Sequence, residues 1–216
     1  NLIPIPEELD NISGSLLEPI AVCVHTSKII ERNVNVLLYG GGFLSQILSQ
    51  ILIEMNCSVS CIDRNEYKKE YFNDDILFLS KSDDLDDSSF DYSIECCGAN
   101  GVINECIRLT KPNGKIVQLA NPSIDLQISS QSISNLMRKE QSFIGTWNSS
   151  FRPDNPELCD FQKSIKMIIG DKINIKNLIS HSIKIEDSVD LLNQIYLRRE
   201  NKNALPKYNK CLVEIS

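Results

Sequence analysis

The segment VNVLLYGGGFLSQILSQ, residues 34–50, decides how the rest of the sequence is read. It opens with a largely apolar run up to Tyr39, which is the pattern of a strand covered on both faces. Three consecutive glycines follow, and beyond them apolar residues recur at the spacing of a helix that packs one face on a sheet. Those residues are Phe43, Leu44, Ile47, Leu48, Ile51, Leu52 and Met55. The segment therefore predicts a buried strand, a tight glycine turn and a helix.

Strand-like and helix-like segments alternate along the chain as far as about residue 150. Strands that alternate with helices pair in parallel through right-handed crossovers. We therefore predict an α/β fold, a doubly wound parallel six-stranded sheet of the Rossmann type. Its further strands are expected at residues 58–62, 76–79, 91–96, 115–119 and 142–147, and its further helices at residues 101–109 and 130–138.

Two regions flank this predicted domain. Residues 7–30 have a mostly helical pattern with a possible break near Gly14, so residues 1–31 are expected to form a connecting segment and an entry helix. The Rossmann domain itself is expected to span residues 32–150. The pattern then changes, and residues 151–216 are expected to form an appendage of helices with a last strand near the C-terminus.

The composition narrows the classes of partner. The net charge is -7, which argues against nucleic acid or an anionic membrane, since both reward a basic surface. No signal peptide opens the sequence and no apolar run is long enough to cross a bilayer, so we expect a cytoplasmic protein. The eight cysteines form no C-x-x-C pair, so free thiols are expected rather than a structural zinc knuckle.

The glycine turn has the form of a dinucleotide-binding site. Gly40 would make the tight turn, and Gly42 would let a pyrophosphate approach the N-terminus of the helix. Ser45 stands where such turns usually carry a third glycine, and it is expected to loosen the packing slightly. Asp63 ends the next strand 21 residues after Gly42, where an acid receives the ribose hydroxyls of NAD and repels a 2′-phosphate. The sequence thus favours NAD over NADP, although the neighbouring Arg64 weakens this preference.

The alternative interpretation is that the glycines only turn a strand into a helix. A lone G-x-G pattern is weak support for a cofactor site. Here the strand, turn, helix, second strand and terminal acid follow one another in the required order, which favours cofactor binding.

Four segments together resemble the zinc-dependent medium-chain dehydrogenases. They are LEPIAVCVH at residues 17–25, FDYSIECCG at residues 90–98, PNGK at residues 112–115, and MRKEQSFIGTWNSS at residues 137–150. Within that family the chain is most similar to the polyol and sugar-phosphate dehydrogenases. The last segment is the most specific, because it resembles a stretch of the galactitol-1-phosphate 5-dehydrogenases.

The resemblance implies the cofactor-binding part of an enzyme that oxidises a secondary hydroxyl to a ketone, or runs the reverse, with NAD and a catalytic zinc ion. The family's amino-terminal GroES-like catalytic domain has no counterpart in this sequence, and the C-terminal helices and strand would belong to that domain. We therefore expect the chain alone to be inactive. The short segment between Asp63 and Phe90 resembles the ribulose-5-phosphate reductases. Ribulose 5-phosphate or ribitol 5-phosphate is thus the alternative to a polyol or another polyol phosphate as substrate.

The resemblance also assigns candidate site residues by position. Glu18 falls where polyol dehydrogenases place a glutamate near the catalytic zinc, with an ordinary helix carboxylate as the alternative. His25, two turns later, is interpreted as a packed helix histidine, and catalytic residues are left unassigned. The residues expected at the cofactor are Gly40, Gly42, Phe43, Leu44, Asp63, Arg64, Lys68, Leu119, Ala120, Asn121, Thr146, Trp147 and Asn148.

A second class of function stays open, in which the chain is a catalytically dead NAD-binding or dimerisation module. In related dehydrogenases the last strand of the cofactor domain pairs with its twin in a second subunit. Phe143, Ile144 and Trp147 form an apolar edge segment without proline, and an unprotected strand edge invites pairing. We predict a homodimer through this edge, and no nucleic-acid or membrane partner.

Overall fold

The computed structural model describes residues 2–122, 124–152, 154–200 and 207–215. The chain divides into two compact units, Asn1–Ile173 and Asn174–Ser216. The first unit contains a six-stranded sheet and the second a two-stranded sheet. The narrower limits expected for the Rossmann domain, residues 32–150, stay a prediction.

The larger sheet confirms the predicted fold class. Neighbouring strands all pair in parallel, in the order β3-β2-β1-β4-β5-β6. The chain order reverses between β1 and β4, and ligands of open α/β sheets bind at the carboxyl ends of the strands around such a switch point. The strands are β1 (Asn35–Tyr39), β2 (Ser58–Ile62), β3 (Leu77–Leu79), β4 (Phe90–Glu95), β5 (Thr110–Gln118) and β6 (Ser142–Gly145).

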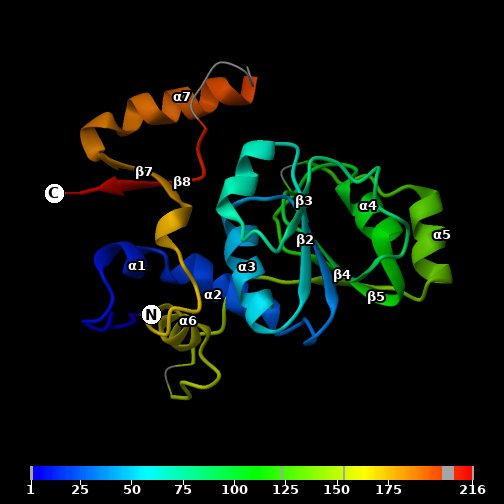
Figure 1. The fold of residues 1–216 in the computed structure, drawn as a ribbon, viewed down its shortest axis with the longest axis horizontal. Helices are drawn as coiled ribbons and strands as arrows, with labels where there is room; N and C mark the ends of the chain where they lie inside the picture. The colour runs from blue at the N-terminus through cyan, green and yellow to red at the C-terminus, as the bar shows by residue number, and fades with distance from the viewer. Residues whose placement is uncertain (1, 123, 153, 201–206, 216) are drawn as a thin grey trace. The chain divides into compact units, whose positions relative to one another are not determined.

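Helices lie on both faces of this sheet (Figure 1). On one face is α3 (Phe43–Glu54), with α2 (Leu17–Ser27) packed beside it. On the other face are α4 (Val102–Leu109) and α5 (Ser130–Arg138). The unit also contains α1 (Asn11–Ser15), the 3-10 helix η1 (Glu66–Tyr71) and α6 (Asp160–Ile169).

The core lies between the sheet and these helices. Residues 36–38 of β1 are fully buried, as expected for a strand with helices on both sides. On the second face, Ile103 and Ile107 of α4 pack on Ile116 of β5. Burying this continuous apolar surface is what makes the parallel sheet stable.

Some element boundaries differ from the sequence expectation. β5 begins five residues early, because Thr110 pairs with Phe90 before the register shifts around the turn that follows. β6 ends at Gly145, two residues early. The N-terminal helical region begins only after Asp10, whose carboxylate caps α1 by accepting a hydrogen bond from the Ser13 N–H (2.8 Å).

The second unit contains β7 (Ile179–Lys184) and β8 (Lys210–Glu214), which pair in parallel. Between them lie the 3-10 helix η3 (Ile185–Asp187) and α7 (Ser188–Glu200), and the 3-10 helix η2 (Lys176–Leu178) precedes β7. The sequence predicted the helix and the last strand. It did not predict β7, because the polar residues 180–182 give no clear strand pattern.

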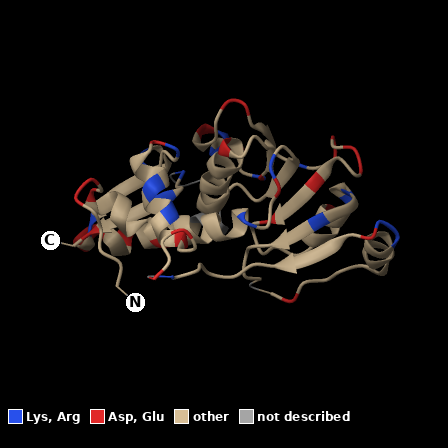
Figure 2. Ribbon diagram, turned by 90° about the horizontal axis from the view of Figure 1, so that it is seen from below, with Lys and Arg blue, Asp and Glu red and all other residues tan. Residues whose placement is uncertain are grey.

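Charged residues of both signs are interspersed along the loops and helices in the view of Figure 2. Acidic residues outnumber basic ones in the whole sequence, 29 against 22. Among the described residues, no helix combines the length and the apolar character that crossing a membrane requires.

Candidate functional site

The glycine turn between β1 and α3 has one position that demands glycine and one that is open to solvent. Gly40 has a φ of +109°, and a Cβ there would lie 2.9 Å from the Cβ of Cys97. Gly42 is the N-cap of α3, and a Cβ there would meet no atom within 4 Å. No side chain caps this helix. The helix N-terminus therefore faces open space, where its dipole favours an anion such as a pyrophosphate.

Two buried side chains donate hydrogen bonds to backbone carbonyl groups of the turn. The hydroxyl of Ser45 donates a hydrogen bond to the Gly40 carbonyl, and Gln46 Nε2 donates to the Gly41 carbonyl (3.0 Å). Ser45, which replaces the usual third glycine, is therefore a bonded part of the turn.

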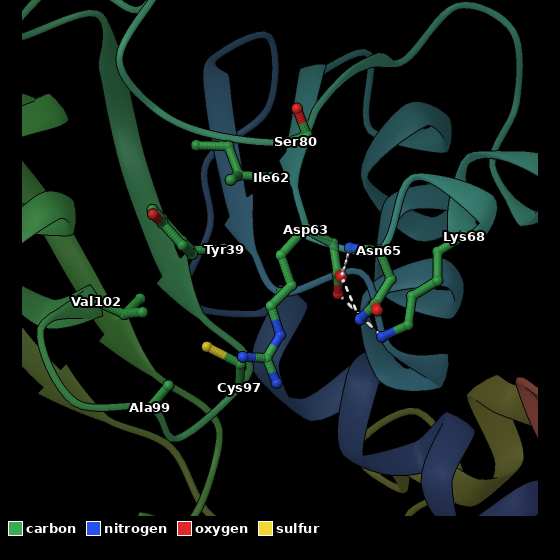
Figure 3. Close-up of a pocket in the computed structure, with 11 residues that line it drawn as sticks. Tyr39, Ile62, Asp63, Asn65, Lys68, Ser80, Cys97, Ala99 and Val102 are labelled. Atoms are coloured by element: carbon green, nitrogen blue, oxygen red, sulfur yellow. Dashed lines mark hydrogen bonds and ion pairs between the residues drawn. The ribbon is translucent and has the colours of Figure 1, made fainter. Parts of the chain in front are cut away.

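A cavity of about 370 Å³ opens beside this turn at the carboxyl ends of the central strands (Figure 3). Four of its residues, Gly40, Asp63, Arg64 and Lys68, were expected from the sequence. Seven others were not expected. Each of them ends a strand, follows a strand at the same sheet edge, or is the first residue of α4. The predicted strand ends could therefore have indicated them. These are Tyr39, Ile62, Asn65, Ser80, Cys97, Ala99 and Val102.

The Asp63 carboxylate is the polar centre of this cavity. Its Oδ2 accepts hydrogen bonds from the Gly41 N–H (2.8 Å) and from Lys68 Nζ (2.9 Å). Its Oδ1 accepts from the N–H (2.8 Å) and the side-chain amide (3.0 Å) of Asn65. These contacts appear as dashed lines in Figure 3 where both partners are drawn. A carboxylate has about four lone-pair sites, so an incoming hydroxyl must share or displace one donor.

The charge of Asp63 is secured by these contacts. Burial by itself raises the pKa of the Asp63 carboxyl, but the hydrogen bond from Asn65 and the charge of Lys68 outweigh burial, so the pKa is lower than its usual value. Asp63 is therefore ionised at neutral pH and can accept hydrogen bonds from ribose hydroxyls.

A second cavity, of about 330 Å³, lies where α2, the end of β5 and the segment after β6 meet. The only lining residue that was not expected is Val22. It lies one helical turn after Glu18, so the spacing of residues on a helix face could have revealed it. The expected residues that line this cavity are Glu18, Leu44, Leu119, Ala120, Asn121, Thr146, Trp147 and Asn148. Trp147 is 73% exposed.

Two expected residues, Gly42 and Phe43, line neither cavity. They occupy the N-cap and first position of α3, immediately before Leu44, which lines the second cavity. The structure thus gathers the expected cofactor residues into the glycine turn and two cavities. Gly40 of the turn lines the first cavity, and Leu44, just after the turn, lines the second.

Buried contacts hold the segment after β6 against α2. Asp160 is fully buried. Its Oδ2 accepts a hydrogen bond from the Ser150 N–H (2.6 Å). The same oxygen lies 3.0 Å from His25 Nδ1. Lys28 forms an ion pair with Oδ1 of the same carboxylate. His25 is thus a packed helix residue, as its sequence context indicated.

Glu18 is exposed on α2. The described residues contain no group of three or more His, Cys, Asp or Glu side chains arranged to hold a metal ion. Structural and catalytic zinc sites take three or four protein ligands, so Glu18 and its described neighbours do not fit a zinc ion by themselves.

Replacement of Gly42 by alanine should separate folding from ligand binding. The new Cβ would have free space in the unliganded chain, so the melting temperature should fall by no more than about 4 °C. The methyl group would occupy the approach of a pyrophosphate, so affinity for NADH should fall more than about tenfold. Calorimetry and NADH titration would measure the two effects, with Gly40→Ala as the variant that should fail on stability. An unchanged NADH affinity in Gly42→Ala would contradict this placement of the phosphates.

Comparison with known proteins identifies relatives of this chain. The sequence model of the zinc-binding dehydrogenase family matches residues 44–164, more than half of the chain. Sorbitol dehydrogenase 1 of Saccharomyces cerevisiae is 25% identical over 207 residues, which cover 87% of this chain and 55% of the yeast protein. Galactitol 1-phosphate 5-dehydrogenase of Escherichia coli K12 is 21% identical over 220 residues, which cover 95% of this chain and 62% of that protein.

Solved structures share the fold. The crystal structure of galactitol-1-phosphate dehydrogenase from Escherichia coli matches with a TM-score of 0.80 at 19% identity, covering 99% of this chain and 63% of that chain. A zinc-binding dehydrogenase of Sinorhizobium meliloti bound to NADP matches with a TM-score of 0.76 at 19% identity, covering 99% and 62% of the two chains. The chain therefore spans between about half and two thirds of the length of these relatives.

Proposed function

The chain belongs to the zinc-binding dehydrogenase family, and we propose that it is the cofactor-binding part of a zinc-type, NAD-dependent dehydrogenase that interconverts a secondary hydroxyl and a ketone. The observation that carries this proposal is the arrangement of the glycine turn between two cavities at the switch point of the sheet. One cavity has an ionised acid for the adenosine ribose, and the other has the residues expected beside the nicotinamide.

The described residues fit a dinucleotide. The space over Gly42 admits a pyrophosphate at the N-terminus of α3, and Asp63 offers acceptors to the ribose. Lys68, on a flexible stem, is the donor that can give way when ribose hydroxyls bind Asp63. Bound NAD would supply the hydride acceptor of the reaction. The chain's own task is to hold the nicotinamide ring between the 119–121 and 146–148 segments, in line for an alcohol.

Zinc would belong to the complete reaction, but Glu18 alone does not make a zinc site. Glu18 stays a candidate ligand because it lines the same cavity as the expected nicotinamide residues.

The C-terminal unit, with β7 and β8, is proposed to belong to the GroES-like catalytic domain. We further propose a cytoplasmic protein without nucleic-acid or membrane partners.

The substrate class proposed is a polyol or a polyol phosphate, because the matched relatives include a sorbitol dehydrogenase and a galactitol 1-phosphate 5-dehydrogenase. Ribulose 5-phosphate or ribitol 5-phosphate is the alternative, since only 26 residues separate Asp63 from Phe90.

Titration of the chain with NADH and with NADPH tests the proposed cofactor. We expect NADH to bind about tenfold more tightly, because Asp63 repels a 2′-phosphate and a like-charge contact of this size costs about 1.4 kcal/mol. Fluorescence of Trp147, which is the only tryptophan and lines the second cavity, should be quenched by either nucleotide. Equal or inverted affinities would refute the role of Asp63, and the absence of binding would refute the proposed function.

A second function, dimerisation, is favoured by the exposed edge of the sheet. β6 is an edge strand, and Phe143 on it is 48% exposed. On α5, which precedes β6 in the chain, Ile133 is 43% exposed and Met137 is 70% exposed. An apolar edge of this kind is a site for strand pairing with a second copy. A module without catalysis would keep this surface, so the dehydrogenase and the catalytically dead module are expected to assemble in the same way and to differ in catalysis.

Sedimentation equilibrium at tens of micromolar chain should therefore detect a homodimer. Ile144→Lys places a charge on the edge strand and should shift the equilibrium towards monomer. Lys184→Ala, a change on β7, serves as the control and should leave the association constant unchanged. A wild-type monomer would contradict the pairing, and a dimer that survives Ile144→Lys would place the contact elsewhere.

A further inference from the structure

Glu95 is a buried carboxylate to which the proposed function gives no role. It ends β4, beside the switch point, and is 1% exposed. Its Oε1 accepts hydrogen bonds from the N–H groups of Cys97 (2.9 Å) and Gly98 (2.8 Å) and from the Cys97 thiol (3.0 Å). Cys97 and Ala99 line the first cavity, on the side opposite Asp63 (Figure 3). One oxygen of Glu95 therefore fixes the loop that borders the expected adenosine site.

The other oxygen of Glu95 reaches the neighbouring strand. Gln118 Nε2 on β5 donates a hydrogen bond to Glu95 Oε2 (2.5 Å) and a second one to the carbonyl of Ala120 (2.7 Å). The backbone carbonyl of Glu95 also accepts from the N–H groups of Leu119 (3.0 Å) and Ala120 (3.1 Å). Leu119 and Ala120 line the second cavity. The same residue thus holds a wall of each cavity.

The carboxylate also contributes to the orientation of the Gln118 amide. A carboxylate only accepts hydrogen bonds, so it requires the amide to present its NH₂ group. In this orientation Gln118 Oε1 is buried and has no hydrogen-bond partner among the described residues. A buried, unpaired oxygen is costly. Glu95 Oε2 and the Ala120 carbonyl, both acceptors, together set this orientation, and the amide thereby connects the carboxylate to the Ala120 carbonyl.

We infer that Glu95 is a positioning residue that links the two halves of the cofactor site. One carboxylate oxygen holds the loop at Cys97 and Gly98 beside the adenosine, and the other holds Ala120 beside the nicotinamide through Gln118. The inference rests on the proposed function, because it assigns the two cavities to the two halves of one dinucleotide.

Glu95→Gln tests this link with almost no change in volume. The new amide oxygen can still accept from Cys97 and Gly98, so the adenosine side should be preserved. The new NH₂ group faces the NH₂ group of Gln118, so the Gln118 amide should turn and release the Ala120 carbonyl. Affinity for NADH should fall about tenfold, the effect of about one buried hydrogen bond, while affinity for AMP should change less than about twofold. Both would be measured by calorimetric titration of the 216-residue chain.

Glu140→Gln, at an exposed carboxylate outside both cavities, is the matched control and should leave both affinities unchanged. Equal losses for AMP and NADH, or no loss for either, would overturn the inference while leaving the proposed function intact. Failure of the wild-type chain to bind NADH would instead remove the proposed function.

The wild-type chain offers a test that needs no variant. The side-chain amide protons of Gln118 should exchange slowly with solvent, and their NMR chemical shifts should change with NADH but not with AMP. Fast exchange, or an equal shift with both nucleotides, would also overturn the inference.

Discussion

Asp63→Ala is expected to weaken NADH binding about 100-fold. The ribose presents two hydroxyls, and each hydrogen bond to a charged acceptor contributes about 1.5 kcal/mol or more, so the loss is about 3 kcal/mol, or two powers of ten in affinity. NADPH binding should fall less, because the same change removes the repulsion of its 2′-phosphate. Lys68, released from its 2.9 Å contact with Asp63, would then be available to that phosphate. The tenfold preference for NADH should therefore vanish or invert.

Asp75→Ala provides the matched control, since Asp75 is an exposed acid that precedes β3 and lines neither cavity. It should leave both affinities unchanged. Asp63→Ala also removes the acceptor of the Gly41 N–H, so the melting temperature must be recorded with each titration. A variant that folds and still binds NADH within threefold of the wild type would contradict the assignment of Asp63 to the ribose.

Asp160→Asn should destabilise the chain by about 3 kcal/mol. Asp160 of α6 is fully buried, and it contacts His25 of α2, Lys28 immediately after α2, and the N–H of Ser150 in the segment after β6. Removing one partner of a buried ion pair costs about 3–5 kcal/mol. The lower end applies, because the partners His25 and Lys28 are 31% and 36% exposed and can turn to water. The melting temperature should fall by roughly 6–12 °C in calorimetry.

Glu157→Gln is the matched control for this variant. Glu157 also pairs with a lysine, Lys166, but both side chains are well exposed, at 77% and 62%. Exposed pairs of this kind contribute little to stability, so the melting temperature should not change measurably. Equal effects of the two substitutions would show that Asp160 does not anchor the segment after β6.

The same carboxylate predicts how stability depends on pH. Burial raises the pKa of the Asp160 carboxyl, but Lys28, the Ser150 N–H and His25 outweigh burial, so its pKa in the folded chain lies below the ordinary value. A depressed carboxyl pKa stabilises the fold at every pH above the unfolded value of about 3.9. That contribution is lost as the pH falls from about 3.9 through the folded pKa. Asp160→Asn should therefore be less stable than the wild type at pH 7, and the difference should shrink in acid.

Features that depend on neighbours in the sequence could be predicted without a structure. The apolar run up to Tyr39, the glycines and the apolar spacing after Phe43 defined a strand, a turn and a helix, because each is set by local periodicity and backbone freedom. Alternation of such units defined a parallel sheet, since crossovers of this length and hand permit little else. The position of Asp63 at a strand end then placed an acid beside the turn. Family resemblance added the residues of the second cavity.

Only the tertiary structure decided how distant polar groups pair. Asp160 lies 135 residues from His25, and Gln118 lies 23 residues from Glu95. Neither pair has a local spacing that predicts it, because the crossovers between parallel strands bring such residues together only when the sheet forms. The sequence by itself therefore determined the fold class and the glycine turn. The tertiary structure decided that Lys68 and Asn65 occupy the Asp63 carboxylate, and that buried Glu95 joins the walls of both cavities, because burial and hydrogen-bond geometry arise only from packing in three dimensions.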